Sequence, residues 1–572
     1  MDITYIQELG KGSFGSVWKV RDNNSGKELA IKKMKYSSDN LINPTDLKEI
    51  AYTKLFNHPN IISSSYIIGT SGNHINAFID SDNTINTTIE LMENSLDRFV
   101  KGILEGKIDD ELLTTDNLKS ITHQAISGLY YMHSHGYTHN DIKPGNILYK
   151  ILPDKKLLVK LADLGIAEYL GIPLPKNAVG SGGTDLFKAP NSVEDLIYEP
   201  GNHYSYKSDM FSIGATLLWI FSMIVQTPFT KFLKDGFGYV DINGAEYISA
   251  RETIVSIFTE DGYDFITKCL DPKSDTRLSS KRALKHPFLG SYQLGGSFFE
   301  FVNSIIRKPS MDDYINGNYE LEYIDDMYNN YKDRTITSYI DLSRHTNIKY
   351  GQLELIDNWV LTTAKRLEVD NMDAYFTYSQ YYLEYLSKHL DIPVNKLQLF
   401  AASALTTSDN LWANVLSYIT LDGIVDVAKG LFKPEQLTMA QLELLDTLDF
   451  NLSFTPVMFF LHYWYLKSIY GHPSRLPNTK VLTVSIALMT IIIVTHDNNR
   501  LVDLSVDSVA KYCVQKAIHI ENYTSNAIMS ILEVPKGYSD ILDDVVKGYM
   551  EKDLSKRSSL DELKDIVTGI ED

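Results

Sequence analysis

Residues 139–148 of the chain read HNDIKPGNIL, and residues 161–165 read LADLG. Each stretch contains an aspartate, and the first also contains a lysine and an amide side chain. Transfer of a phosphoryl group to a hydroxyl needs such a set. One carboxylate orients the hydroxyl and accepts its proton, while a second carboxylate and an amide oxygen hold Mg²⁺ against the phosphates. A lysine can neutralise the charge of the transferred group. The predicted roles are catalytic base for Asp141, metal ligands for Asn146 and Asp163, and charge neutralisation for Lys143.

A glycine-rich turn stands near the start of the chain. Residues 10–17 read GKGSFGSV and lie between two predicted strands, 3–12 and 13–22. Glycines let a backbone approach phosphates closely, and a strand–turn–strand setting forms a flap over ATP. No helix opens at the third glycine, so the pattern does not indicate a dinucleotide-binding fold. Taken alone, it is equally typical of an ordinary hairpin.

A lysine and a glutamate follow in the order that phosphate binding requires. Lys32 lies on the next predicted strand, within reach of the α and β phosphates, and Glu49 lies on a predicted helix, 44–56, with Pro44 in its first turn. Taken separately, such residues are most often surface charges. Together with the two aspartate stretches, they predict an ion pair that holds the lysine against ATP.

These motifs resemble a eukaryotic-type protein kinase domain over residues 1–290. The resemblance implies an α+β two-lobed fold, with a small lobe at 1–92, a large lobe at 93–290, and ATP with Mg²⁺ in the cleft between the lobes. It implies a catalytic set of Asp141, Lys143, Lys32, Glu49 and Thr184. It implies ATP contacts from Leu9, Gly10, Lys11, Gly12, Ser13, Phe14, Gly15, Val17, Ala30, Lys32, Glu90 and Met92.

The resemblance also indicates the substrate class and two structural residues. Lys143, two positions after Asp141, resembles the lysine that serine/threonine kinases carry there. Thr184, in GGTDLFKAP, resembles the threonine that the same class keeps near this lysine and aspartate. Asp209 matches the helix aspartate that braces the catalytic loop, and Arg277 matches the late arginine of the large lobe. We therefore expect protein substrates that carry serine or threonine.

Three positions depart from the family pattern. Asn140 replaces an arginine, Leu164 replaces a phenylalanine, and Asn191 replaces the glutamate after Ala-Pro. The leucine keeps an apolar plug. Asn191 removes the carboxylate that pairs with the late arginine, so Arg277 must find another partner or solvent.

The helix segment 44–61 resembles that of the cyclin-dependent kinases, in which three arginines bind a phosphorylated loop residue. The matching positions here are Lys48, Asn140 and Glu168, and the acceptor position is Val179. Because the three phosphate-binding positions and the acceptor position are all altered, we expect activity without loop phosphorylation. The alternative is that Ser181 is the acceptor. Phe14 in the glycine flap excludes inhibitory tyrosine phosphorylation there.

The second half of the chain is predicted to be all-α. A linker at 291–345 precedes helices at 352–368, 372–390, 396–416 and 438–450. The order of segments resembles a cyclin, with a box at 346–456, a second helical set at 457–548 and a tail at 549–572. The two residues by which cyclins grip a kinase correspond to Asp409 and Gln441, so the grip is changed. The alternative is a plain helical scaffold. The combination of halves resembles kinase–cyclin fusions of large DNA viruses.

Composition limits the remaining classes. The net charge of −19 over 572 residues argues against a nucleic-acid partner. Two distant cysteines, Cys269 and Cys513, cannot form a disulfide framework, and no secretory leader opens the sequence, so we expect an intracellular, non-secreted protein. The apolar run 481–495 is short for a membrane span and is predicted to be a buried helix.

Three functional hypotheses follow. The first is an active serine/threonine kinase whose cyclin-like half acts in cis on the helix that carries Glu49. The second is a catalytically weak pseudokinase and cyclin-like scaffold that recruits a host kinase. The third treats the second half as an independent adaptor. The complete set of phosphate-handling residues favours the first, with a protein substrate and either an intramolecular contact or a host kinase or cyclin as partner.

Overall fold

A computed structural model of the protein describes residues 2–12, 15–34, 42–68, 74–81, 84–170, 184–190, 205–234, 238–274, 276–290, 323–334, 344–367, 369, 371–412, 419–470, 479–494, 504–520, 532, 534 and 536–550. The chain divides into two compact units. The first comprises Met1–Lys35, Lys48–Met327 and Asn414–Leu416. The second comprises Tyr36–Leu47, Tyr328–Ala413 and Ser417–Asp572.

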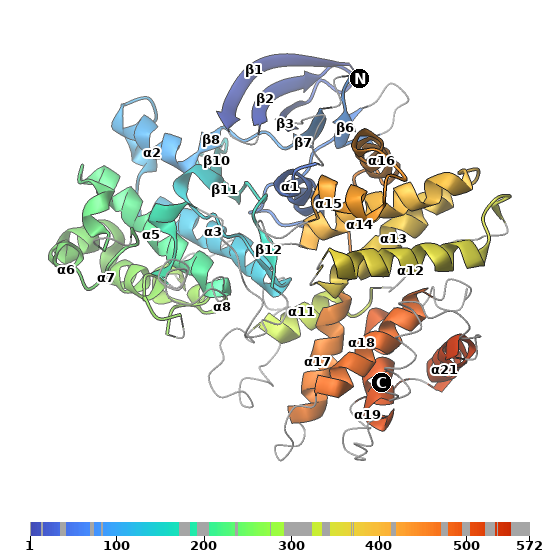
Figure 1. Ribbon diagram of the computed structural model, residues 1–572. Helices are drawn as coiled ribbons and strands as arrows, with labels where there is room; N and C mark the ends of the chain where they lie inside the picture. The colour runs from blue at the N-terminus through green and yellow to red at the C-terminus, as the bar shows by residue number, and fades with distance from the viewer. Residues whose placement is uncertain are drawn as a thin grey trace. The chain divides into compact units, whose positions relative to one another are not determined.

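The first unit begins with a five-stranded antiparallel sheet in the order β1-β2-β3-β7-β6 (Figure 1). Alternating side chains from these strands bury one apolar face, as expected for a half-buried sheet. The predicted strands at the N-terminus are confirmed. The strands are β1 (Ile3–Gly12), β2 (Gly15–Asp22), β3 (Glu28–Met34), β6 (Ala77–Ile79) and β7 (Ile85–Ile89).

Helix α1 (Pro44–Leu55) follows the third strand and begins at the predicted proline. Proline suits this position because its fixed φ matches a helix and its missing N–H would have no intrahelical partner there. Residues up to Leu47 belong to the second unit, and the helix continues from Lys48 in the first. The helix that carries Glu49 is therefore shared between the two units.

The rest of the first unit is mainly helical, as predicted. Two long helices, α3 (Thr115–Ser134) and α5 (Tyr206–Ile224), are buried along most of their length. Thr114 caps α3 by accepting the N–H of Asn117. The other helices are α2 (Leu96–Leu104), α6 (Ala245–Ser249), α7 (Arg251–Cys269), α8 (Ser280–Ala283) and α9 (Pro287–Gly290).

Short strands connect these helices to the site. Strands β8 (Asn94–Ser95), β10 (Ile147–Ile151) and β11 (Leu157–Leu161) form a three-stranded sheet in the order β11-β10-β8. Strands β9 (Tyr137–Thr138) and β12 (Glu168–Tyr169) pair with each other, as do β4 (Ile67–Ile68) and β5 (His74–Ile75). The stretches 139–148 and 161–165 thus begin or end at paired strands, which fixes their positions.

Arg277 finds partners inside the protein. It is 1% exposed, and its guanidinium donates to the carbonyl oxygens of Asp271, Lys207 and Pro272 at 2.8, 3.2 and 3.1 Å. It also lies over the ring of Phe211, with 5.2 Å between the guanidinium carbon and the ring centre. Backbone carbonyls and an aromatic face therefore surround this arginine, and it does not turn to solvent.

The second unit is helical, which confirms the fold class. Helix α14 (Leu397–Trp412) packs against α12, α13 and α16, and nearly all its side chains are buried. Its other helices are α12 (Tyr350–Arg366), α13 (Met372–Lys388), α15 (Leu421–Val427), α16 (Pro434–Thr447), α17 (Val457–Tyr470), α18 (Thr479–Val494), α19 (Val506–Ile520) and α21 (Lys536–Met550).

Residues 481–494 of the apolar run lie in helix α18, as predicted, and the side chains from Val481 to Ile493 are mostly buried. Among the described residues, no helix combines the length and apolarity needed to cross a bilayer. Cys269 and Cys513 are both buried free thiols. Helix α11 (Ile324–Tyr331) lies within the segment predicted as a linker.

Candidate active site

The predicted ion pair between strand β3 and helix α1 is formed. The Nζ atom of Lys32 donates to Oε2 of Glu49, and it lies 3.8 Å from Oδ1 of Asp163. Both side chains of the pair are nearly buried, at 12% and 9% exposure. Burial raises the pKa of the Glu49 carboxyl, and the Lys32 ammonium opposes this rise. The geometry places one ammonium between two carboxylates from different elements.

The predicted catalytic base lies in a cluster of hydrogen-bond donors. Lys143 Nζ donates to Oδ2 of Asp141 at 2.7 Å and to Oγ1 of Thr184 at 2.8 Å. The Thr184 hydroxyl in turn donates to Oδ1 of Asp141 at 2.9 Å. The three residues therefore form a closed triangle, with a carboxylate that accepts from both partners. Such a carboxylate is held in one orientation, as a base that must meet a substrate hydroxyl requires.

The two predicted metal ligands present oxygen atoms. Asn146 turns its amide nitrogen towards Asp141, donating to the backbone carbonyl at 2.9 Å and to Oδ2 at 2.8 Å. Its amide oxygen therefore points to the other side and has no hydrogen-bond donor among the described residues. The Asp163 side chain is 36% exposed. A carboxylate and an amide oxygen are hard ligands that suit Mg²⁺ when phosphate oxygens complete its shell, so the donor set fits.

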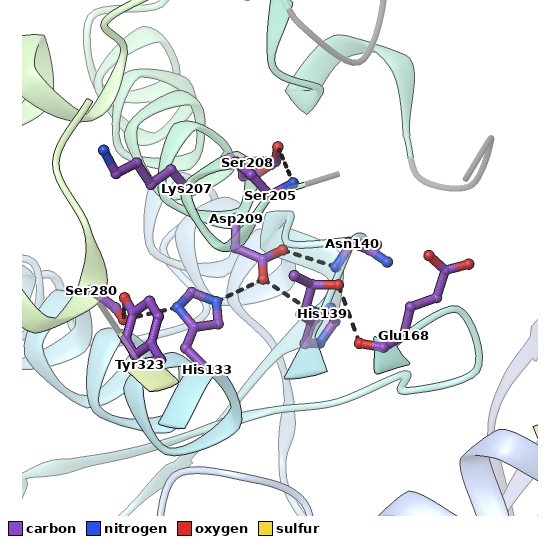
Figure 2. A network of polar contacts seen from close by, with 12 residues as sticks. His133, His139, Asn140, Glu168, Ser205, Lys207, Ser208, Asp209, Ser280 and Tyr323 are labelled. Atoms are coloured by element: carbon purple, nitrogen blue, oxygen red, sulfur yellow. Dashed lines mark hydrogen bonds and ion pairs between the residues drawn. The ribbon is translucent and has the colours of Figure 1, made fainter. Parts of the chain in front are cut away.

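A buried aspartate braces the loop that carries Asp141. Asp209, on helix α5, is 1% exposed and accepts the N–H groups of His139 and Asn140, each at 2.8 Å. Figure 2 shows this carboxylate between the loop and His133. Asn140 has a φ of 66°, in the left-handed region that asparagine tolerates better than most residues. Two charge-assisted hydrogen bonds to one carboxylate hold this unfavourable backbone in place.

His139 joins the loop to the segment that carries the second aspartate. Its Nε2 atom lies 3.1 Å from the carbonyl oxygen of Ala162, and its Nδ1 atom accepts the N–H of Asp141 at 3.3 Å. A neutral imidazole with the proton on Nε2 satisfies both contacts. Asp163, directly after Ala162, also has a positive φ of 63°. Leu164 is fully buried, so the apolar plug expected at this position is present.

The positions predicted to contact adenine lie on β2, β3 and the segment after β7. Ala30 is 3% exposed, and Val17 pairs with Lys32 across β2 and β3. The Glu90 side chain faces inward, accepting from Ser63 and lying 2.7 Å from Lys160 Nζ. Neither the N–H nor the carbonyl of Met92 is hydrogen-bonded to another described residue. That backbone is therefore available to a nucleobase.

The glycine flap is partly described. Leu9, Gly10, Lys11 and Gly12 end strand β1, and Gly15 begins β2 with a φ of 145°. A Cβ atom at Gly15 would lie 2.0 Å from the carbonyl oxygen of Lys33, so only glycine fits there. Ser13 and Phe14 lie outside the described residues. Gly12 pairs with Gly15, so the described residues on either side of the turn form the two antiparallel strands that the sequence predicts.

The three positions that correspond to phosphate-binding arginines in the cyclin-dependent kinases hold other residues here. Lys48 and Glu168 are both buried, at 2% and 7% exposure. Burial raises the pKa of Glu168, and the charge of the Lys48 ammonium opposes the rise. Asn140 donates from Nδ2 to the carbonyl of Ile166 at 3.1 Å. Val179, Ser181 and Asn191 lie outside the described residues.

Aromatic rings hold the same face of α1 on the β9–β12 pair. Tyr52, one turn after Lys48, lies 5.2 Å from the ring of Tyr137 in an edge-to-face arrangement. Tyr137 makes similar contacts with Phe56 at 5.1 Å and with Tyr169 at 5.1 Å. Helix α1 therefore packs through aromatic rings on Tyr137 of β9, the strand that pairs with β12.

Sequence reasoning missed three polar residues. In the first unit, His133 lies within hydrogen-bond distance of both Asp209 and Ser280. In the second unit, Asn410 and Gln441 hydrogen-bond the backbone of Ile42. His133 lies on a buried helical face, a position at which a histidine is usually no more than a core residue. The spacing between these residues and their partners is too long for any local pattern to reveal.

Comparisons with known proteins agree with this geometry. Residues 3–289 match the protein kinase domain. The chain is 26% identical over 309 residues to cell division control protein 2 homolog C of Antirrhinum majus, covering 50% of this chain and 95% of that protein. It is 26% identical over 316 residues to cyclin-dependent kinase B1-1 of Arabidopsis thaliana, covering 50% and 96%.

A third relative belongs to a differently named group. Serine/threonine-protein kinase 4 homolog A of Dictyostelium discoideum is 29% identical over 286 residues, covering 50% of this chain and 55% of that protein. All three similarities fall on one half of the sequence. Since the matched residues 3–289 make up half of the 572 residues and hold the whole constellation around Lys32, Asp141 and Asp163, the chain belongs to the protein kinase family.

Proposed function

We propose that the protein uses ATP and Mg²⁺ to phosphorylate serine and threonine hydroxyls of other proteins. The observation that carries this proposal is the triangle of Asp141, Lys143 and Thr184, in which a buried carboxylate is oriented by an ammonium and a hydroxyl. The name of one relative, a serine/threonine-protein kinase, supports the same substrate class, and another relative is named a cyclin-dependent kinase.

Each residue of the site has a chemical task in this proposal. Bound ATP with its metal supplies the phosphoryl group and neutralises its charge. Lys32, held by Glu49, binds the non-transferred phosphates, and Asn146 and Asp163 offer the oxygen ligands for the metal. Asp141 orients the substrate hydroxyl and takes its proton, and Lys143 offsets the negative charge near that carboxylate.

We propose further that activity does not require phosphorylation of the loop. Of the three positions that would bind such a phosphate, one holds Lys48, one holds the neutral Asn140 and one holds the buried carboxylate of Glu168. A carboxylate at one of these positions would repel an added phosphate. The aromatic contacts of Tyr52 and Phe56 with Tyr137 hold α1 without a bound phosphate.

One experiment tests both statements. Protein made in bacteria and treated with a phosphatase is expected to transfer label from γ-labelled ATP to a basic protein substrate as fast as untreated protein. The labelled product should contain phosphoserine or phosphothreonine. Phosphotyrosine alone would contradict the substrate class. Activity that vanishes on phosphatase treatment and returns with phosphorylated Ser181 would contradict independence from loop phosphorylation.

We also propose that the helical second unit is cyclin-like and controls the kinase in cis through the start of helix α1. Residues 36–47 belong to that unit. Within it, the N–H of Ile42 donates to Oε1 of Gln441 at 3.3 Å, and its carbonyl accepts from Nδ2 of Asn410 at 3.4 Å. Ile42 is 3% exposed, and both amides are fully buried. These contacts fix the chain just before the helix that carries Glu49.

The contact uses a position that the cyclin resemblance singles out. Gln441 stands where cyclins carry a glutamate for gripping the kinase, and its Nε2 atom donates to Thr407 Oγ1 at 3.2 Å. A neutral amide can accept from a backbone N–H and also donate to a hydroxyl, so it satisfies both partners without burying a charge. Asp409, the other expected position, accepts the N–H of Ile419 at 2.7 Å.

Replacing Gln441 with alanine is expected to lower kcat/KM for phosphate transfer by about tenfold, because it leaves the buried Ile42 N–H without an acceptor and loosens the entry to α1. Tyr381→Phe is the matched control, since it removes one buried hydrogen bond, from Tyr381 OH to the Leu452 carbonyl, elsewhere in the same unit. The measurement is steady-state transfer alongside the melting temperature. Unchanged transfer by Gln441→Ala, or an equal loss in both variants, would contradict control through this contact.

A further inference from the structure

Part of the segment predicted as a linker docks into the kinase unit. Residues up to Met327 belong to the first unit, although the matched kinase domain ends at residue 289. Tyr323, Ile324 and Met327 are at most 1% exposed, as in a folded core. A spacer between domains has no reason to bury three apolar side chains. These residues are therefore a structural part of the unit that holds the active site.

The docked segment meets the two long helices of the large lobe. The ring of Tyr323 lies 5.4 Å from that of His133 and 5.0 Å from that of Tyr206. The hydroxyl of Tyr206 donates to the sulfur of Met327 at 3.8 Å. A Cβ atom at Gly136 would lie 2.8 Å from that sulfur, so the close approach needs glycine there.

Charged and polar contacts complete the docking. The carboxylate of Asp326 is 6% exposed and lies 3.1 Å from Nζ of Lys281, and it accepts from the hydroxyl of Tyr130 at 3.4 Å. Burial raises the pKa of Asp326, and the Lys281 ammonium opposes the rise. The segment is thus held by aromatic packing, a thioether contact and a largely buried ion pair.

A chain of hydrogen bonds runs from Tyr323 to the catalytic loop (Figure 2). The Tyr323 hydroxyl lies 2.8 Å from Oγ of Ser280, which lies 2.8 Å from Nδ1 of His133. The Nε2 atom of His133 lies 3.0 Å from Oδ2 of Asp209. That same oxygen accepts the N–H of His139 at 2.8 Å, next to Asn140 and Asp141.

The chemistry of the groups gives this chain a direction. A carboxylate only accepts, so the His133 Nε2 atom carries a proton and donates to Asp209. In the neutral imidazole, Nδ1 then accepts the hydroxyl hydrogen of Ser280. The Ser280 oxygen is left to accept from Tyr323. Tyr323, Ser280 and His133 each donate towards Asp209, and such aligned hydrogen bonds strengthen one another. The Asp209 carboxylate in turn accepts the N–H groups of the catalytic loop.

We propose that Tyr323 is a positioning residue for the catalytic loop, acting through Ser280, His133 and Asp209. Asp209 holds the left-handed backbone of Asn140, and the orientation of the next residue, Asp141, depends on that backbone. A shift of about 1 Å in a catalytic group lowers a rate substantially. The segment after the kinase domain therefore sets the geometry of the base. This inference rests on the proposed kinase activity.

The test compares single hydroxyl deletions in the full chain. Tyr323→Phe keeps the ring and removes the hydroxyl that bonds Ser280, and Ser280→Ala removes the next member of the chain of hydrogen bonds. Each is expected to lower kcat by about threefold to tenfold with the KM for ATP unchanged. The double variant should be no worse than the poorer single variant, because both act through His133.

The matched control is Tyr247→Phe. Tyr247 is also 1% exposed in the same lobe, and its hydroxyl bonds Thr267 Oγ1 at 2.8 Å, with no link to Asp209. A fall in melting temperature shared by both tyrosine variants, with kcat unchanged in both, would overturn the proposal and leave Tyr323 a packing residue. A selective fall of kcat in Tyr323→Phe supports it.

A second readout separates this inference from the proposed function. Hydrogen exchange of the backbone amides of His139 and Asn140 reports how firmly Asp209 holds them. Tyr323→Phe should speed their exchange by about threefold to tenfold, whereas Tyr247→Phe should not. If the wild-type chain transfers no phosphate, the proposed function fails, but faster exchange in Tyr323→Phe would still support the positioning role. Unchanged exchange would overturn it.

Discussion

Replacing Asp141 with asparagine is expected to lower the rate of phosphate transfer by about a thousandfold, within the range seen for loss of a general base. The amide keeps the size of the carboxylate but cannot take the proton of a substrate hydroxyl. It also replaces one acceptor oxygen with a donor, although Lys143, Thr184 and Asn146 all donate to this side chain. Lys143 and the Asn146 amide nitrogen can only donate, so the new amide nitrogen is expected to face Thr184, whose hydroxyl must then accept where it now donates.

The measurement is transfer from γ-labelled ATP to a basic protein, with ATP binding followed separately. Binding should be retained, because Lys32, Glu49 and the β1–β2 turn are untouched. Asp116→Asn is the control, since the Asp116 side chain is 90% exposed and its amide isostere should leave both quantities unchanged. Full activity of Asp141→Asn would remove the base from the mechanism. Absence of transfer in the wild-type chain, with ATP still bound, would favour the pseudokinase hypothesis.

Replacing Lys32 with methionine is expected to lower kcat/KM for ATP by at least about a hundredfold, since a positioned ammonium is lost where charge develops. Glu49→Gln should have a smaller effect of the same kind. The double variant should resemble Lys32→Met alone, because the glutamate acts only by holding the lysine. Lys33→Met is the control, since Lys33 points to the opposite face of strand β3 and lies over the ring of Tyr5, at 4.7 Å.

The same variant should show a stability that depends on pH. In the wild type, burial raises the pKa of Glu49 and Lys32 lowers it. Without the ammonium the pKa of the folded state rises further, so the folded protein holds a proton that the unfolded chain has lost. Its stability relative to wild type therefore falls as the pH increases above 4.5, the ordinary value for this group.

Melting temperatures of Lys32→Met and wild type, measured from pH 5 to pH 8, check this expectation. The deficit of the variant should widen with pH and should largely disappear in Lys32→Met with Glu49→Gln. Parallel curves of melting temperature against pH for the wild type and Lys32→Met would contradict it, because they would show that loss of the ammonium does not raise the pKa of Glu49.

The sequence by itself predicted the parts of the protein that depend on neighbouring residues. The glycine-rich turn and the segments that flank it predicted strands β1 and β2, and the placement of Pro44 predicted the start of α1. Asp141, Lys143 and Asn146 lie within six residues of one another, so their common location follows from one short loop. Such features are readable because chain connectivity and backbone sterics determine them.

Only the tertiary structure decided how distant segments meet. Nothing in the sequence links Ile42 to Gln441, 399 positions apart, because the atoms of Ile42 involved are a backbone N–H and carbonyl that every residue except proline carries. Arg277 likewise donates to three backbone carbonyls that no sequence pattern marks as its partners. Tyr323 lies in a stretch without helical periodicity, yet its hydroxyl ends the chain that reaches Asp209. Local patterns encode which face of an element is buried, whereas the partner that covers that face is selected by packing of the whole chain.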